Sequence, residues 1–154
     1  MPELQPGSTV HGRDMPPAQF DLDWTTISNI TTTSYITGTP SVGVTFTAPS
    51  SGRVLVAIGC GIRNNAATTE RAIVTFAILE DNIDGVVHTA VDGASGVMSQ
   101  GVPLSQDFTY MGSLKMISDL TPGKGYLCQV YYRSTAGAGT VDISSRDVTV
   151  IPLT

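Results

Sequence analysis

Apolar and polar residues alternate with a period of two along most of the chain after Trp24, the pattern of β-strands that bury one face. The segment 42–48 predicts such a strand, and residues 49–52 (Pro-Ser-Ser-Gly) predict the turn that follows it. The residues expected to face the core in this strand and the next are Val42, Val44, Phe46, Ala48, Val54, Val56, Ile58, Cys60 and Ile62. Opposite them, Gly59 and Gly61 predict a second surface close to the backbone.

The middle of the chain departs from simple alternation. Residues 72–79 are apolar at both parities, which predicts a central strand or one buried at an interface. Asp84-Gly85 predicts a hairpin turn with residues 86–91 as the returning strand, whereas the Gly- and Ser-rich stretch 92–106 predicts a long loop. Alternation then resumes, with the apolar positions Phe108, Tyr110, Leu114 and Met116.

The last part of the chain predicts two strands. Residues 120–126 form a turn that leads into a strand with one apolar face, made by Tyr126, Cys128, Val130 and Tyr132. In the final strand, residues 139–151, Val141 and Ile143 share one parity but Val148 and Val150 have the other. A β-bulge near residues 144–146 would return all four side chains to a common face.

These strands, about eight in number, predict an all-β fold. Residues 24–154 are expected to form a two-sheet antiparallel β-sandwich, jelly-roll-like in topology. The segment Leu120-Thr-Pro-Gly-Lys-Gly-Tyr126 resembles the Leu-x-Pro-Gly-x-x-Tyr corner of fibronectin type III domains. A fibronectin type III or immunoglobulin-like topology is therefore the alternative.

Residues 1–23 show no consistent period and contain four prolines, so we expect an extended N-terminal arm that orders against a partner. The other interpretation is a loose terminus without a role. The residues of the arm expected to bind the partner are Leu4, Val10, Arg13, Asp14 and Met15.

Charge and hydropathy narrow the range of partners. The net charge is −5 and the eight basic residues are scattered singly, which argues against nucleic acid as a partner. No basic segment precedes a long apolar run, so we expect neither a signal peptide nor insertion into a membrane. We therefore expect the protein to be synthesised in the cytoplasm.

The sequence offers little chemistry for catalysis. Cys60 and Cys128 lie in no C-x-x-C pair and in phase with apolar neighbours, which favours two buried free thiols over a disulfide. His11 and His88 have no metal spacing, and Ser99 misses the G-x-S-x-G pattern by one residue. The acidic stretch 80–85 lacks calcium-loop spacing and predicts a hairpin rim, with a bound cation as the minor alternative. We therefore expect a non-enzymatic protein without cofactors.

Four stretches, residues 4–14, 25–30, 44–59 and 145–153, resemble small virion surface proteins of actinobacterial tailed phages, of the minor tail or capsid decoration type. The resemblance implies a β-sandwich building block on the virion surface, commonly trimeric, with the major capsid or tail protein as partner. Residues 72–79, which are apolar at both parities, also predict a homotrimer, because a two-sheet sandwich buries only one face of each sheet.

Two functions stay open on the sequence. The protein could be a capsid decoration protein attached through its arm. It could instead be a minor tail or tail-fibre protein that binds a host-surface glycan or receptor through loops such as 63–70 and 92–106.

Overall fold

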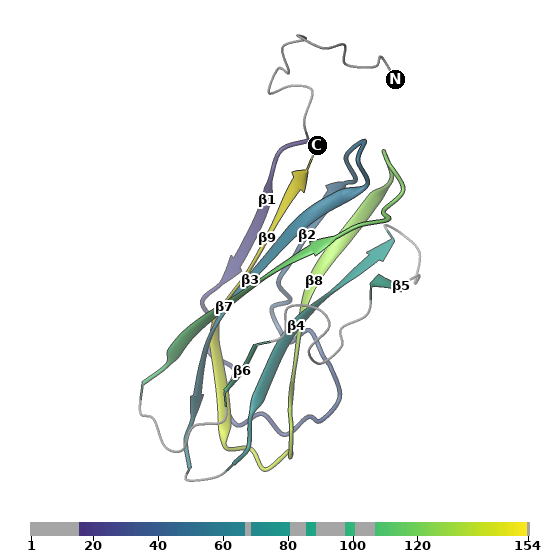
Figure 1. Ribbon diagram of the computed structural model, residues 1–154. Coiled ribbons are helices and arrows are strands. Elements are labelled where there is room, and N and C mark those ends of the chain that lie inside the picture. The colour runs from purple at the N-terminus through teal and green to yellow at the C-terminus, as the bar shows by residue number, and fades with distance from the viewer. Residues whose placement is uncertain (1–15, 67–68, 81–85, 89–97, 101–106, 154) are drawn as a thin grey trace.

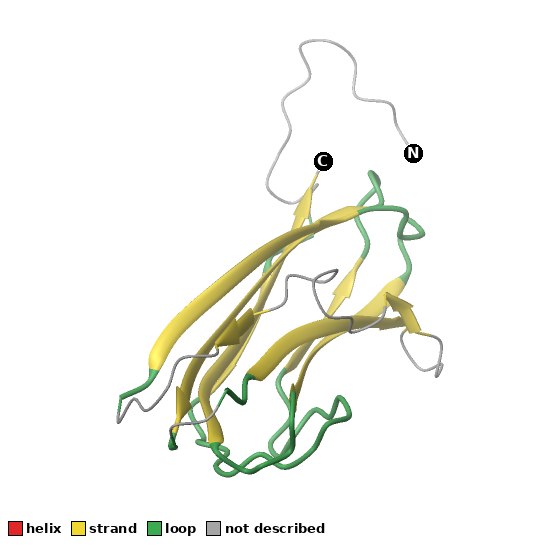
Figure 2. Ribbon diagram, turned by 60° about the horizontal axis from the view of Figure 1, so that its bottom comes forward, coloured by secondary structure: helices red, strands yellow, loops and turns green. Residues whose placement is uncertain are grey.

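The computed structural model describes residues 16–66, 69–80, 86–88, 98–100 and 107–153, with backbone only for the two three-residue segments. In these ranges all regular structure is β-strand (Figures 1 and 2). The strands are β1 (Gln19–Asp23), β2 (Gly43–Thr47), β3 (Arg53–Asn64), β4 (Ala72–Glu80), β5 (Val86–His88), β6 (Met98–Gln100), β7 (Thr109–Ile117), β8 (Gly125–Ser134) and β9 (Val141–Leu153).

The strands form two antiparallel sheets that pack face to face. One sheet has the order β1-β9-β3-β7 and the other β2-β8-β4-β5, while β6 pairs with the opposite end of β4. Successive strands pass from one sheet to the other except around β4, β5 and β6, which makes two interlocked Greek keys. The predicted jelly roll is therefore confirmed, and the fibronectin-like alternative does not fit the strand order.

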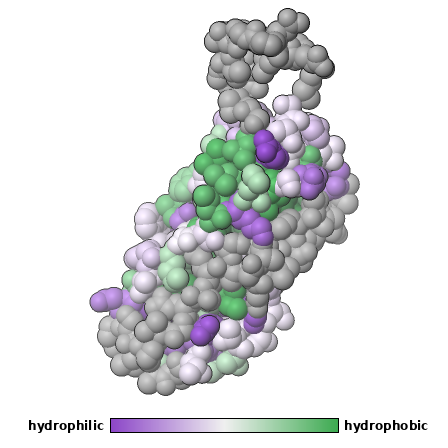
Figure 3. All heavy atoms as spheres, viewed as in Figure 1, coloured by the Kyte–Doolittle hydropathy of each residue, from purple (hydrophilic) through white to green (hydrophobic). Residues whose placement is uncertain are grey.

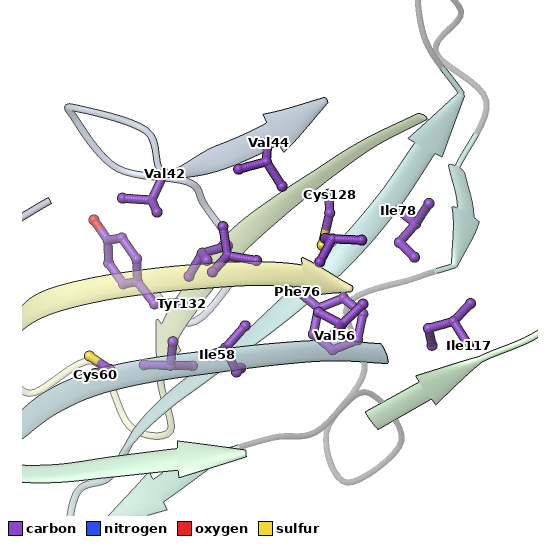
Figure 4. Close-up of a cluster of buried hydrophobic side chains, with 14 of the residues drawn as sticks. Val42, Val44, Val56, Ile58, Cys60, Phe76, Ile78, Ile117, Cys128 and Tyr132 are labelled. Carbon is purple, nitrogen blue, oxygen red and sulfur yellow. The ribbon is translucent and has the colours of Figure 1, made fainter. Parts of the chain in front are cut away.

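The core lies between the sheets, where side chains from both layers point toward one another (Figure 4). Every residue of β2, β3 and β8 that alternation assigned to the core is at most 8% exposed. Burying a large aliphatic or aromatic side chain contributes about 1.5–3 kcal/mol, so this shared face is the main source of stability. The two thiols lie in the same core and are free, as predicted, and burial raises the pKa of Cys60 to about 12.

The turn before β8 is fixed by a tyrosine. The hydroxyl of Tyr126 accepts a hydrogen bond from the backbone N–H of Thr121 at 3.0 Å, and the Tyr126 ring stacks on Phe46 with centroids 5.7 Å apart. The segment 120–126, which resembles a corner of fibronectin type III domains, thus forms a turn of this kind within a jelly roll.

The predicted β-bulge is present in β9. Gly59 of β3 pairs with Asp147 and Gly61 pairs with Ser144, so Ser145 and Arg146 together face the single residue Cys60. Ser145 has a φ of 51°, which lets the chain take up the extra residue. Residues before and after the bulge consequently share the core: Val141, Ile143, Val148 and Val150 are all fully buried.

Strand β4 is buried on both faces, as its composition predicted. It lies between β8 and the short strands β5 and β6, and its outward residues Ile73, Thr75 and Ala77 are at most 7% exposed. This burial is reached within a single chain. The apolar residues on the outward face of β4 are therefore not in themselves a reason to expect a neighbouring subunit.

Two expected boundaries need correction. Strand β1 lies inside the segment 1–23 assigned to the arm, because Gln19–Asp23 pairs with β9, so the sandwich begins before residue 24. Strand β6 lies inside the predicted loop 92–106, where Met98–Gln100 pairs with β4. Both segments have only three to five paired residues, too few for period-two alternation to stand out. The predicted Asp84-Gly85 turn lies outside the described residues, although β5 does pair with β4 as a returning strand.

Candidate interaction surface

Strand β7 turns its apolar side away from the core. In the register with β3, Leu114 lies opposite Ala57 and Met116 opposite Leu55, and these β3 residues alternate with the buried ones. Leu114 is 62% exposed. The predicted alternation of β7 is thus present, but its apolar side forms part of the outer surface of the sheet.

The other strands of this sheet extend the same surface. Across β9, Phe20 of β1 lies opposite Thr149, and Ile151 lies opposite Leu55 of β3. Figure 3 shows apolar atoms gathered on this side of the molecule. We call this surface the outer apolar face, and its members are Phe20, Leu22, Trp24, Leu55, Ala57, Tyr110, Leu114, Met116 and Ile151. The exposed fractions of its largest side chains are Phe20 62%, Trp24 71%, Tyr110 65%, Leu114 62%, Met116 55% and Ile151 39%.

A hollow of about 420 Å³ lies within this face, between Phe20 and Trp24 on one side and Tyr110 on the other. Its floor includes Gly59, where a Cβ atom would collide with the carboxylate of Asp147. At Gly61 a Cβ would come within 3.0 Å of the Tyr110 ring. The second surface predicted over these two glycines therefore exists, and it consists of side chains of the same sheet.

Asp147 is the only carboxylate among the described residues that line the hollow. Burial raises the pKa of Asp147, and a hydrogen bond from the backbone N–H of Gly59 opposes this rise in part. A carboxylate held by the backbone in this way adds an acidic group to a hollow lined mostly by apolar side chains.

Away from this face, the buried ionisable groups hold loops in place. Glu70 is 3% exposed and accepts hydrogen bonds from the Ser134 hydroxyl, from the backbone N–H of Ala138 at 2.7 Å and from the backbone N–H of Thr140 at 2.9 Å. Burial opposes ionisation, but these hydrogen bonds outweigh it and hold the pKa of Glu70 at about 2. Glu70, at one end of the predicted glycan-binding loop 63–70, is therefore held in place by hydrogen bonds to residues 134–140. Residues 67–68 of this loop lie outside the described part of the chain.

The low pKa of Glu70 predicts a pH-dependent stability. The pKa is about 2 in the folded chain against an ordinary value of 4.5 for glutamate, so the ionised carboxylate stabilises the fold fully above pH 4.5. This contribution, on the order of 3 kcal/mol, is lost as the pH falls toward 2. We expect Glu70→Gln to destabilise the protein at pH 7 and to differ little from wild type near pH 2, in urea unfolding at each pH.

The matched control for this prediction is Glu80→Gln, which removes a partly exposed carboxylate paired with Lys124 at 2.7 Å. Such surface pairs contribute about 0–1 kcal/mol, so this variant should unfold almost as wild type does at pH 7. If Glu70→Gln lowered the free energy of unfolding by the same amount at pH 7 and at pH 2, the low pKa of Glu70 would be contradicted.

A second buried network fixes the crossing between β1 and β2. Arg146, in the bulge of β9, is fully buried and forms an ion pair with Asp23. Its guanidinium also donates to the carbonyls of Thr37 and Pro40, both at 3.1 Å. Sequence reasoning missed this role, and the signal that could have found it is a lone arginine at the parity break of the strand, between the apolar pairs Val141/Ile143 and Val148/Val150.

The residues proposed from sequence as the partner-binding set, Leu4, Val10, Arg13, Asp14 and Met15, lie outside the described residues. The described chain starts at Pro16, and Pro16 and Pro17 line a hollow together with Thr45, Thr47 and Gly125. Within the described ranges, no three His, Cys, Asp or Glu residues are grouped to hold a metal ion, and no helix is long and apolar enough to cross a membrane.

No protein-family model and no curated protein matches the sequence. Among solved structures, a chain of infectious bursal disease virus, Gx strain, aligns with a TM-score of 0.50 and 11% identity over 89% of this chain. This chain spans 32% of that viral chain. Eiger TNF from S. frugiperda aligns with a TM-score of 0.44 and 10% identity, over 91% of this chain and 94% of that one. The CBM22-1 xylan-binding domain of Paenibacillus barcinonensis Xyn10C aligns with a TM-score of 0.38 and 12% identity, over 88% of this chain and 87% of that one. At these identities the likeness concerns the fold.

Proposed function

We propose that this protein is a non-enzymatic structural protein of a phage particle, a capsid decoration protein on the virion surface that attaches through its N-terminal arm. Its partners are the major capsid or tail protein, and it assembles as a homotrimer. The observation that carries the proposal is the outer apolar face, a broad uncovered surface of a kind that marks sites of contact with other proteins.

Other features support a building block rather than a catalyst. The buried ionisable groups Glu70, Asp142 and Arg146 are engaged with loops and neighbouring strands, which is a structural use of charge. The viral chain with a TM-score of 0.50 shares the jelly-roll fold, and the phage resemblance of the sequence points in the same direction.

Deleting residues 1–17 tests the role of the arm. These residues precede β1, so the truncated protein should keep its fold and a melting temperature within a few degrees of wild type. We expect it to lose attachment to phage particles, measured by co-sedimentation of purified protein with particles that lack it. If the truncated protein attached as well as wild type, the sandwich and not the arm would contain the docking surface.

The alternative is a minor tail or tail-fibre protein that binds a host-surface glycan. It is favoured by one observation, the exposed rings of Trp24 and Tyr110 on either side of a hollow that contains the carboxylate of Asp147. Aromatic faces and a few fixed polar groups are the usual components of a small-ligand site. Antibody labelling of particles distinguishes the two functions, because decoration predicts label on the head and the alternative predicts label on the tail.

A further inference from the structure

We propose that the outer apolar face is the surface through which copies of this chain bind one another. The inference deepens the homotrimer in the proposed function by assigning its interface to β1, β9, β3 and β7. It does not depend on where in a virion the protein lies, so it can fail or succeed separately from attachment through the arm.

The area of the face is that of a stable protein interface. Its six largest side chains are between 39% and 71% exposed. Taking about 200 Å² for each fully exposed large side chain, they present roughly 700 Å² per chain. A standard interface buries about 800 Å² on each partner, and the face of one copy approaches this area in total when it is shared between its two neighbours in a ring.

The distribution of charge favours a second copy as the occupant. The chain carries a net charge of −5, so two copies repel each other over most approaches. The nine members of the outer apolar face carry no charge, and Asp147 in its hollow already accepts a hydrogen bond from Gly59. Copies can therefore meet here without placing exposed like charges opposite one another.

The face has a protruding part and a recessed part. It carries a row of protruding side chains on β7, which includes Leu114 and Met116, and a hollow over Gly59. The row of one copy can enter the hollow of the next, which is how two sheets pack through interdigitated side chains. Each copy then contacts two neighbours through different parts of the face. Such heterologous contacts form a closed ring when the rotation between neighbours permits it, and a ring of three copies is the assembly we expect.

The experiment measures the mass of the full-length chain by sedimentation at micromolar concentration, for wild type and for two double variants. Leu114→Lys with Met116→Lys places two cations on β7, within the protruding row of the face. Thr45→Lys with Thr47→Lys places them at exposed positions on β2, in the opposite sheet, as the matched control. Circular dichroism establishes that both variants keep the β-sheet spectrum of wild type.

We expect wild type and the control to sediment as multimers, and the Leu114→Lys/Met116→Lys variant to require about a hundredfold higher concentration to associate. A wild-type mass of one chain would overturn the proposal. So would an unchanged mass of the Leu114→Lys/Met116→Lys variant. A monomer that binds glycans and loses this binding with Trp24→Ala would assign the face to the ligand site of the alternative function instead.

Discussion

Val130→Asp is expected to unfold the protein at room temperature. Val130 is fully buried in β8, between the two sheets, as part of the hydrophobic core. Burying an unpaired carboxyl group there costs on the order of 5 kcal/mol or more, comparable with the whole stability of a small domain. The loss of the far-ultraviolet β-sheet spectrum at 25 °C, with an early urea transition for any folded remainder, is the measurement.

Thr45→Asp is the control for this substitution. Thr45 is exposed on β2, and its neighbours Val44 and Phe46 are buried, so the same chemical change is made on the outside of the same sheet. The variant should unfold within about 0.5 kcal/mol of wild type, as surface substitutions usually do. Equal destabilisation of the two variants would show that the assignment of inner and outer faces is wrong.

Asp23→Ala is expected to have the second largest effect. The substitution leaves the fully buried guanidinium of Arg146 without its counter-charge, while the carbonyls of Thr37 and Pro40 remain as acceptors. Removing one partner of a buried ion pair costs about 3–5 kcal/mol, because the remaining charge is desolvated and uncompensated. Urea unfolding should show this decrease in the free energy of unfolding.

The double variant Asp23→Ala/Arg146→Met separates loss of the pair from loss of packing. Methionine fills much of the space of the arginine without a charge, so the double variant should be more stable than Asp23→Ala alone. If Asp23→Ala were as stable as wild type, the ion pair would not be what compensates the charge of Arg146.

The sequence predicted those parts of the fold where alternation and burial coincide. Strands β2, β3 and β8 have one strictly apolar face, and each of these faces is in the core. The bulge at Ser144–Arg146 could also be predicted, because parity can be restored in a strand only by an extra residue.

The outer apolar face could not be predicted in the same way. A period of two shows that a strand has an apolar side, but it does not tell which sheet surface that side occupies. On β7 the apolar residues Leu114 and Met116 face outward, whereas Met111 and Ile117 contact the core. The face also combines β1 with β7, strands far apart in the sequence that the pairing of β9 with β1 and β3 brings into one sheet.

The position of β9 within its sheet has a consequence for how the protein is made. Strand β9 (Val141–Leu153) is synthesised after the eight other described strands, yet it lies between β1 and β3 and pairs with both. Until it is synthesised, β1 has no strand to pair with and one edge of β3 remains open, so the first sheet cannot close during translation. Folding that depends on pairing between strands far apart in the sequence is slow, and unpaired strand edges in the incomplete chain are sites of aggregation. A chain that ends before residue 141 should therefore accumulate as insoluble material rather than as a smaller folded domain.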